Sequence, residues 1–563
     1  MGTDRFHRHP VLAMAVLLIA WGRAPAQTAP ATYLIEFTHK GGTPHSFDAP
    51  GTFLGPRAVE RRVRQGIPLD SLDLPVDPAF VFALQQAGDL QVLGTSRWQN
   101  SATIRSTDTL ALDTLDRLPF VRAIRCMHDG RPRPARDGAK YPAVMKNSVD
   151  AVDESTYGQG FRQLSMLNGH LLHRAGATGR GMVLGVLDSG FDGVDELPAF
   201  AALRDRQGIV LAADLVQADG DVYDDHWHGR SVLSVIAGDL PGRFLGVAPE
   251  VDVALVRTED ADNEFIVEED HWVRGAELLD SLGCDVLNTS LGYTTFDDST
   301  QDHSVDDLDG RTTRISIAAG VAARKGMVVV NSAGNSGESA WYRISPPADA
   351  EGILAVGAVG LERQSAPFSG HGPSADGRVK PDVCAVGWQA TGLDVDGTSL
   401  ARINGTSFSG PIVAGLACCL WQLHPERTAV EITDAIRQSA SQALRPDIDL
   451  GYGIPDLWRA HLLLKGEDLT GLRHEAVLEL FPMPFNDGFT AGLYTGEADR
   501  LVLELFDALG RLVWRLTEPV EPGTYRQLAI ADPQLAGLPD GIYHLRADLG
   551  GPLLERSVVK VRP

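Results

Sequence analysis

Cysteine is scarce in this chain, and its spacing excludes two classes of protein. The 563 residues include five cysteines, Cys126, Cys284, Cys384, Cys418 and Cys419, at irregular spacings. A disulfide scaffold would need a regular even set of cysteines, and a cysteine-rich metal site would need CxxC pairs. We therefore expect free thiols that are buried as small hydrophobic side chains.

Positive charge is also scarce, because 74 acidic residues outnumber 50 lysines and arginines to give a formal net charge of -24. Nucleic-acid binding requires basic patches that contact phosphates. The nearest candidate, Arg131 to Arg136, is short and proline-rich. We therefore expect no nucleic-acid partner, and an acidic surface instead favours the solubility of an exported protein.

Long hydrophobic runs are missing as well. The apolar run from Val11 to Trp21 is shorter than the roughly 20 residues that span a bilayer, although a membrane anchor is the alternative interpretation. It follows Arg5 and Arg8 and precedes the small residues 24–26, which predicts a secretory signal peptide over residues 1–26. No later segment is expected to be long and apolar enough to cross a membrane, and the sequence predicts a secreted or cell-surface protein.

The length predicts two to four domains. Residues 27–130 mix β-rich and helical stretches and predict a small α+β domain, and residues 131–160 lack periodicity and indicate a linker. Residues 161–467 alternate apolar runs with helical stretches, which is typical of an α/β fold with a doubly wound, mostly parallel sheet. Residues 468–563 contain short strands between turns and predict a β-sandwich.

Individual elements can also be placed. In the first domain we expect strands at 32–39, within 90–106 and at 120–126, with helices at 57–66 and 110–118. In the α/β domain we expect strands at 182–187, 251–257, 286–289, 327–332 and 353–359, and helices at 232–238, 412–423 and 456–464. In the last domain we expect strands at 501–506, 511–516 and 542–546.

Ser407 stands at the start of the expected helix 412–423, after the turn-forming Gly405. Backbone N–H groups and the positive end of the helix dipole at such a place can stabilise a developing oxyanion. The alternative is that this serine is an ordinary N-cap.

Other polar residues flank the expected strands and helices. Asp188 and Asn335 follow apolar strands, and the carboxyl ends of parallel strands are where sites assemble, although both residues are also ordinary in turns. His226 and His228 precede the expected helix 232–238. One of these histidines could act as a general base, or the pair could ligate a metal in a metal-dependent hydrolase.

The four segments that contain these residues follow one another in the order Asp188, His228, Asn335 and Ser407. In this order they resemble the motifs of the subtilisin-like serine peptidases. The matching motifs are Asp188-Ser189-Gly190, His228-Gly229 with Val232, Ala333-Gly334-Asn335, Gly405-Thr406-Ser407 with Pro411, Gly246-Val247-Ala248-Pro249 and Ser290-Leu291-Gly292. The order Asp, His, Ser separates this pattern from α/β-hydrolases and from chymotrypsin-like enzymes.

The resemblance implies a serine endopeptidase that hydrolyses polypeptides through an acyl-enzyme intermediate. Ser407 would be the nucleophile, His228 the base, Asp188 its orienting partner and Asn335 an oxyanion donor, while Ser290, Leu291 and Gly292 would pair with the substrate as an added strand. The chemistry would need no cofactor. Structural calcium is compatible with the acidic stretches 259–262 and 306–309, but their spacing identifies no ligands.

Departures from the family pattern affect packing rather than proton transfer. Arg230 stands where the family usually has Thr, and Phe408, Ser409 and Gly410 replace small apolar residues. A pseudoenzyme that only binds is the non-enzyme alternative, but it would require the loss of a triad residue, and all three are present.

The flanking domains carry resemblances of their own. Residues 27–130 resemble subtilase propeptides, including those of subtilases exported by some Gram-negative bacteria, which implies inhibition of the active site until cleavage within 129–160. A permanent accessory domain is the alternative.

Residues 468–563 resemble the sorting domain of type IX secretion substrates, through a loose match at 481–485 and better ones at 505–513, 523–525 and 541–543. This implies export through the periplasm and the outer membrane by the type IX secretion machinery. A carbohydrate-binding or adhesive sandwich is the alternative.

Overall fold

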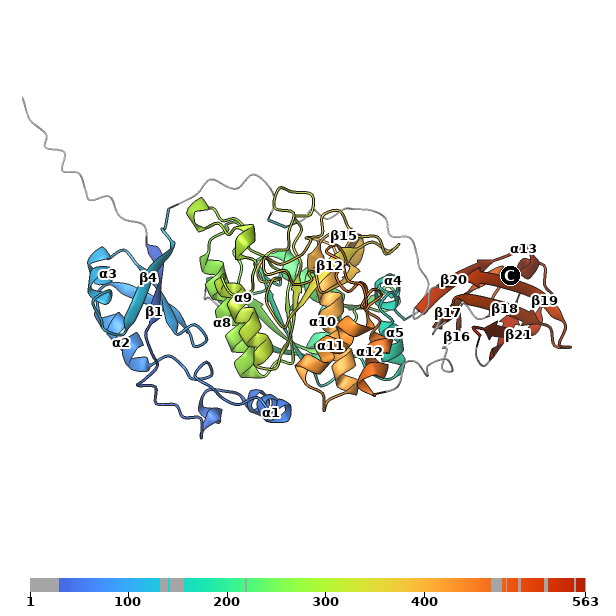
Figure 1. Cartoon of the computed structure of the whole chain (residues 1–563), viewed down its shortest axis with the longest axis horizontal. Helices are drawn as coiled ribbons and strands as arrows, with labels where there is room; N and C mark the ends of the chain where they lie inside the picture. The colour runs from blue at the N-terminus through green and yellow to red at the C-terminus, as the bar shows by residue number, and fades with distance from the viewer. Residues whose placement is uncertain are drawn as a thin grey trace, which may run out of the picture.

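The computed structural model describes residues 30–131, 140–141, 156–217, 220–466, 478–481, 484–494, 498–520, 525–550 and 553–561. A small N-terminal domain, a large central domain and a C-terminal β domain follow one another along the longest axis (Figure 1). The predicted signal peptide and most of the predicted linker lie outside the described residues.

The central domain is built on a seven-stranded parallel sheet in the order β13-β12-β11-β10-β5-β9-β6. The strands are β5 (Val183–Asp188), β6 (Ile209–Asp214), β9 (Asp252–Arg257), β10 (Val286–Thr289), β11 (Val328–Ser332), β12 (Leu354–Val359) and β13 (Val383–Val386). The predicted doubly wound α/β fold is confirmed, and five of these strands lie where the sequence predicted them. The half-exposed edge strand β6 and the four-residue β13 were not predicted.

Helices cover both faces of this sheet, so its inner strands are buried on both sides (Figure 1). The main helices are α7 (Trp227–Ala237), α8 (Val267–Leu282), α9 (Arg314–Arg324), α10 (Thr406–Leu423), α11 (Ala429–Ser439) and α12 (Leu457–Leu464). Side chains of α8 and α9 build one core, and those of α7, α10, α11 and α12 build the other.

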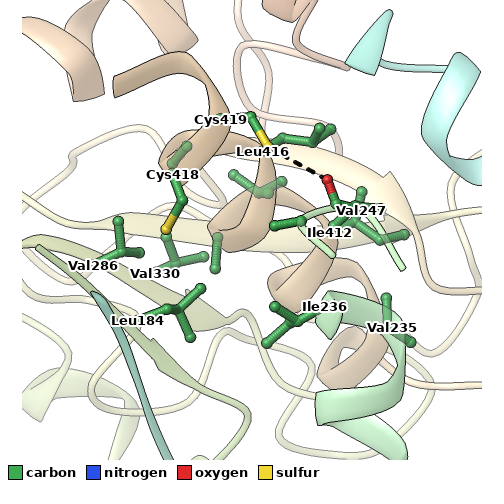
Figure 2. Packing of buried hydrophobic residues seen from close by; sticks show 14 of the residues in the cluster. Leu184, Val235, Ile236, Val247, Val286, Val330, Ile412, Leu416, Cys418 and Cys419 are labelled. Atoms are coloured by element: carbon green, nitrogen blue, oxygen red, sulfur yellow. Dashed lines mark hydrogen bonds between the residues drawn. The ribbon is translucent and has the colours of Figure 1, made fainter. Parts of the chain in front are cut away.

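Helix α10 is long and apolar enough to cross a membrane, which contradicts the expectation that no segment after the signal peptide is. However, 89% of its 18-residue window is buried inside the protein, as in a core helix. Cys418 lies over the sheet residue Val330 (Figure 2), and Ile412 and Leu416 belong to the same buried cluster as Val286 and Val330.

All five cysteines are free. Four of them, Cys284, Cys384, Cys418 and Cys419, are buried as predicted, and burial raises the pKa of each thiol. Cys126 is exposed, so the prediction of burial was wrong there. Its strand, β4 (Val121–His128), is an edge strand of a small sheet, and positions 122, 125 and 126 of this strand are exposed.

The N-terminal domain has an antiparallel sheet in the order β2-β3-β1-β4. Its other strands are β1 (Ala31–Phe37), β2 (Leu90–Ser96) and β3 (Ser101–Ser106), and its helices are α1 (Pro56–Gln65), α2 (Pro78–Gln86) and α3 (Thr109–Leu115). Helix α2, which was not predicted, begins with Pro78 at its first position and with Asp77 as its N-cap.

The C-terminal domain contains two antiparallel sheets, β16-β17-β20 and β19-β18-β21-β22. The strands are β16 (Leu478–Phe481), β17 (Gly488–Tyr494), β18 (Arg500–Phe506), β19 (Leu512–Pro519), β20 (Tyr525–Ala531), β21 (Gly541–Asp548) and β22 (Leu554–Lys560). One core contains side chains from both sheets, including Phe489, Leu503 and Leu545, as expected of a β-sandwich.

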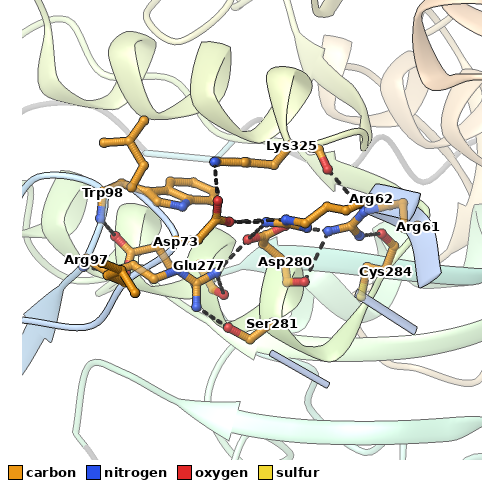
Figure 3. A network of polar contacts seen from close by, with 12 residues as sticks. Arg61, Arg62, Asp73, Arg97, Trp98, Glu277, Asp280, Ser281, Cys284 and Lys325 are labelled. Carbon is orange, nitrogen blue, oxygen red and sulfur yellow. Dashed lines mark hydrogen bonds and ion pairs between the residues drawn. The ribbon is translucent and has the colours of Figure 1, made fainter. Parts of the chain in front are cut away.

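A buried charged network attaches the N-terminal domain to the central domain (Figure 3). Asp280 of α8 accepts hydrogen bonds from Arg61, from Arg62 at 2.8 Å and from Arg97 at 2.5 Å. Asp280 is fully buried. Burial alone would raise the pKa of Asp280, but the three guanidinium groups hold it below its usual value. One buried carboxylate with three cationic partners therefore joins the two domains.

A second carboxylate of α8 binds the backbone of the N-terminal domain. Glu277 accepts hydrogen bonds from the Arg97 and Trp98 N–H groups at 2.9 and 3.1 Å and from the Ser96 hydroxyl. On the other side of the network, Lys325 donates to Asp73 at 2.6 Å. The contact is therefore specific in geometry as well as in charge.

We predict that Asp280→Asn loosens this attachment, because it removes a buried carboxylate from three arginines, of which Arg62 keeps a second partner in Asp73, and breaking a buried ion pair typically costs about 3–5 kcal/mol. In a Ser407→Ala chain, amide hydrogen exchange in α1 should become about 100-fold or more faster. Glu351→Gln, which changes an exposed carboxylate of the central domain, is the control. Unchanged protection of α1 in Asp280→Asn would contradict the role assigned to the network.

Candidate active site

Three neighbouring strands of the central sheet end at the same edge and bring the candidate residues together. Asp188 is the last residue of β5, Ser290 follows β10, and Asn335 lies three residues beyond the end of β11. The strands are adjacent in the order β11-β10-β5. Because they are parallel, their carboxyl ends form one edge of the sheet, as predicted.

Asp188 and His228 are in direct contact. The Nδ1 atom of His228 lies 2.7 Å from Oδ1 of Asp188, and both side chains are fully buried. Gly229 permits this approach, because a Cβ at position 229 would lie 2.3 Å from the carbonyl oxygen of Gly190 and 2.9 Å from Cβ of Asp188. The carboxylate therefore fixes the orientation of the imidazole, with Nε2 as the free ring nitrogen.

His226 has a different environment. It is the N-cap of α7, and its Nδ1 accepts a hydrogen bond from the His228 N–H at 3.4 Å and lies 2.8 Å from the Ser189 hydroxyl. Burial, reinforced by the neighbouring His228, lowers the pKa of His226 to about 4. Of the two histidines, His228 has the carboxylate partner that a general base needs, and His226 caps the helix.

Ser407 lies in the first turn of α10, after Gly405, whose φ of +146° is strained for any other residue. The Ser407 hydroxyl donates to the Ser290 carbonyl oxygen at 3.2 Å. Within the described part of the chain, Nε2 of His228 is buried without a hydrogen-bond partner. The Ser407 hydroxyl and the His228 imidazole are therefore not hydrogen-bonded to each other in this form of the protein.

Asn335 is exposed in the cleft, and α10 fixes its side chain. Its Oδ1 accepts hydrogen bonds from the N–H of Thr406 at 2.8 Å and from the Thr406 hydroxyl at 3.0 Å. Because both bonds use the amide oxygen, the Nδ2 group is left to donate. Asn335 and Ser407 line the same cavity, of about 540 Å³, with Ser290, Leu291 and Gly292.

Arg230, the departure after His228-Gly229, is buried beneath a hairpin. It pairs with Asp192 and donates to the carbonyl oxygens of Asp394 and Val395 at 3.2 and 2.5 Å. These carbonyls follow β14 (Ala390–Leu393), so the arginine anchors the hairpin against α7. Phe408, the other bulky departure, is buried with its ring 5.9 Å from that of His228. Both substitutions alter packing, and neither removes a proton-handling atom.

Two residues of the predicted linker, Lys140 and Tyr141, line the cleft, a placement that was not predicted. The Tyr141 ring centroid is 4.4 Å from that of His228 and 4.5 Å from that of His226. Tyr141 therefore covers the candidate base. The stretch carries no motif, so the sequence held no signal for this contact.

Among the described residues, the one cluster with the composition of a metal site is Glu259, Glu264 and Glu268. The ammonium group of Lys140 lies among these carboxylates, so this form of the protein already has a cation there. In the other acidic stretch that was considered for calcium, Asp309 accepts from the N–H groups of Arg311 and Thr312 and closes a turn.

Comparison with known proteins identifies two of the domains. Residues 179–454 match the family described as the Subtilase family, and residues 32–139 match the peptidase S8 propeptide domain of Bacteroidota. The central domain belongs to the subtilase family. A serine-type endopeptidase is the enzyme class that this membership supports.

Individual subtilases match over similar lengths. Subtilisin E of Bacillus subtilis is 29% identical over 303 residues, which span 52% of this chain and 71% of that protein. Subtilisin BL of Lederbergia lenta is 29% identical over 279 residues, 49% of this chain and 90% of that protein. A thermophilic serine proteinase of a Bacillus species is 31% identical over 278 residues, 48% and 60% of the two chains.

We predict that His226 contributes to acid destabilisation of the subtilase domain. An unfolded histidine has a pKa near 6.5, and that of folded His226 is about 4, so between these values the unfolded chain binds more protons and stability falls as the pH falls. His226→Asn keeps an N-cap acceptor but cannot titrate. In a Ser407→Ala chain, calorimetry from pH 7 to pH 4 should show a smaller fall in Tm for this variant. An equal fall would contradict the prediction.

Proposed function

We propose that the protein is a secreted serine endopeptidase in which Asp188, His228 and Ser407 form the catalytic triad. The observation that carries the proposal is the 2.7 Å contact between buried Asp188 and His228, at the strand ends where Ser407 and Asn335 share one cavity. Subtilase membership supports the same activity.

In the proposed reaction, the Ser407 hydroxyl turns from the Ser290 carbonyl to His228 Nε2, loses its proton to it and attacks the scissile carbonyl carbon. Asp188 stabilises the imidazolium that forms, and the imidazolium then protonates the leaving amine. The Nδ2 group of Asn335 and the Ser407 N–H stabilise the oxyanion. Water then hydrolyses the acyl-enzyme. His228 accepts a proton from the attacking water and returns a proton to the Ser407 oxygen as the acyl group leaves.

The substrate chain would pair with Ser290, Leu291 and Gly292 as an added strand. These residues follow the buried strand β10 and line the cavity that holds Ser407. The chemistry would require no cofactor, because the charged groups of the proposed reaction are all side chains of this chain.

The described form has features of a latent enzyme. Tyr141 lies against His228, and the Ser407 hydroxyl is bonded to Ser290 rather than to the base. The N-terminal domain, which matches an S8 propeptide domain, is bound to α8 through Asp280 and Glu277. We therefore propose that residues 27–130 inhibit the enzyme until the chain is cut within 129–160.

The terminal segments supply a proposed export route. Residues 1–26 would direct secretion, and residues 468–563 would act as a type IX sorting domain that carries the enzyme through the periplasm and the outer membrane. The β-sandwich of the C-terminal domain supports the second role. Its proposed partner is the type IX secretion machinery, alongside polypeptide substrates and the chain's own propeptide.

We predict that a fluorophosphonate probe labels the processed protein and that Ser407→Ala abolishes labelling. Asn335→Ala should retain labelling but lower kcat by about 10²–10³-fold, the loss that removal of the equivalent donor causes in a subtilisin. Peptide hydrolysis measured beside labelling separates the two effects. Labelling that persists in Ser407→Ala would contradict the assignment of Ser407 as the nucleophile.

We predict that deletion of residues 470–563 leaves the protein inside the cells of its host. Fractionation into periplasm, cell surface and medium measures the location, and labelling of the truncated protein shows that the subtilase domain still folds. Secretion at the level of the full chain would refute the sorting role and favour the adhesive alternative.

A further inference from the structure

The loop between β9 and α8 forms a buried acidic pocket beside the candidate active site. The side chains of Glu259, Glu264 and Glu268 are 2%, 12% and 2% exposed, and each offers an oxygen within 4.8 Å of the other two. The cavity that contains Ser290 and Ser407 also has Glu259 and Glu264 in its wall. The pocket therefore opens into the cleft that would hold a substrate.

The ammonium group of Lys140 fills this pocket. Its Nζ lies 2.9 Å from Glu259, 3.1 Å from Glu264 and 2.9 and 3.0 Å from the two carboxylate oxygens of Glu268. It also donates to the carbonyl oxygens of Asp260 and Asn263, both at 2.9 Å. Six oxygens thus surround one nitrogen.

The pocket is built around that cation. Its carboxylates are held by other groups as well, since Tyr293 donates to Glu259 and the Asp260 N–H donates to Glu268 at 2.7 Å. Three buried carboxylates without a cation would repel one another and lose solvation. Burial alone would lower the pKa of Lys140, but Glu259, Glu268 and Glu264 raise it well above its usual value.

The shape of the pocket favours lysine over arginine. Oxygens that converge on a single point suit a compact ammonium ion, whereas a guanidinium group is planar and spreads its donors over a fork. A neutral side chain of the same length would leave the carboxylates unpaired.

We infer that this pocket is a subsite that selects a lysine side chain in the part of a polypeptide substrate N-terminal to the scissile bond. The uncleaved chain presents Lys140 to it as a substrate would. The direction follows from Tyr141, which comes next in the chain and lies over His228, so the segment runs from the pocket toward the catalytic groups. The inference rests on the proposed endopeptidase function and adds a preference for lysine in the substrate.

The test uses internally quenched peptides that carry lysine, arginine, norleucine or glutamate at each of the four positions before the cleaved bond. For the processed enzyme we expect kcat/KM for lysine at one position to exceed that for norleucine by about 10- to 100-fold, with arginine between them and glutamate lowest. Equal rates for all four peptides in an active enzyme would overturn the inference and leave the proposed function standing.

Variants of the pocket sharpen the result. Glu268→Gln and Glu264→Gln should each lower the ratio of kcat/KM for the lysine peptide to kcat/KM for the norleucine peptide. Glu264→Lys, at the most exposed of the three positions, should abolish the preference. The matched control is Glu338→Gln, which removes an exposed carboxylate outside the pocket and should keep the full preference.

Binding provides a readout that does not depend on turnover. In a chain with Ser407→Ala and Lys140→Met, the pocket has lost its own lysine, and a lysine peptide should bind at least about 10-fold more tightly than its norleucine counterpart. If the fluorophosphonate probe fails to label the processed protein with Ser407 intact while this binding difference is present, the proposed function alone is refuted. Equal binding, with a Glu268-dependent rise in Tm on addition of Ca²⁺, would overturn the inference in favour of a metal site.

Discussion

The close approach of α7 to the end of β5 is the constraint on which the candidate site depends. A side chain at position 229 would hold the helix away from Gly190 and Asp188, and the 2.7 Å contact between Asp188 and His228 could not form. The parallel sheet positions the other residues, since the two strands next to β5 on one side end just before Ser290 and three residues before Asn335. Helix α10 completes the arrangement by carrying Ser407 and by holding Asn335 through Thr406.

Basic groups from the N-terminal part of the chain compensate buried negative charges of the subtilase domain. The subtilase domain buries two sets of carboxylates: Asp280 and Glu277 on α8, and the acidic pocket of Glu259, Glu264 and Glu268. Arginines of the N-terminal domain satisfy Asp280, backbone N–H groups and a hydroxyl of that domain satisfy Glu277, and Lys140 satisfies the acidic pocket. An acidic enzyme is thereby paired with basic groups from its own preceding segments.

Much of the fold could be predicted from the sequence, because continuous apolar runs such as residues 286–289 and 353–359 mark buried parallel strands. The same reasoning placed Asp188 and Asn335 at strand ends. It missed β6 and β13, since an edge strand and a four-residue strand lack a long apolar run, and it missed α2. The wrong expectation for Cys126 came from treating every thiol as a core residue.

Other features could not be foreseen because they depend on residues that are distant in the chain. Lys140 meets Glu268, and Arg230 meets Asp394 and Val395, through the tertiary fold rather than through any local pattern. In the same way, Arg62 reaches Asp280 across 218 positions of the chain. The motifs identified which residues could react, whereas the environment of those residues required the structure.

The placement of the cysteines has a consequence for oxidation chemistry. Cys126, the exposed thiol, belongs to the N-terminal domain, and the four thiols of the subtilase domain are buried with raised pKa values that suppress the reactive thiolate. Release of the N-terminal domain would carry away the one accessible sulfhydryl group of the chain. The mature enzyme would then meet an oxidising exterior with no thiol within reach of peroxide or of a stray disulfide partner.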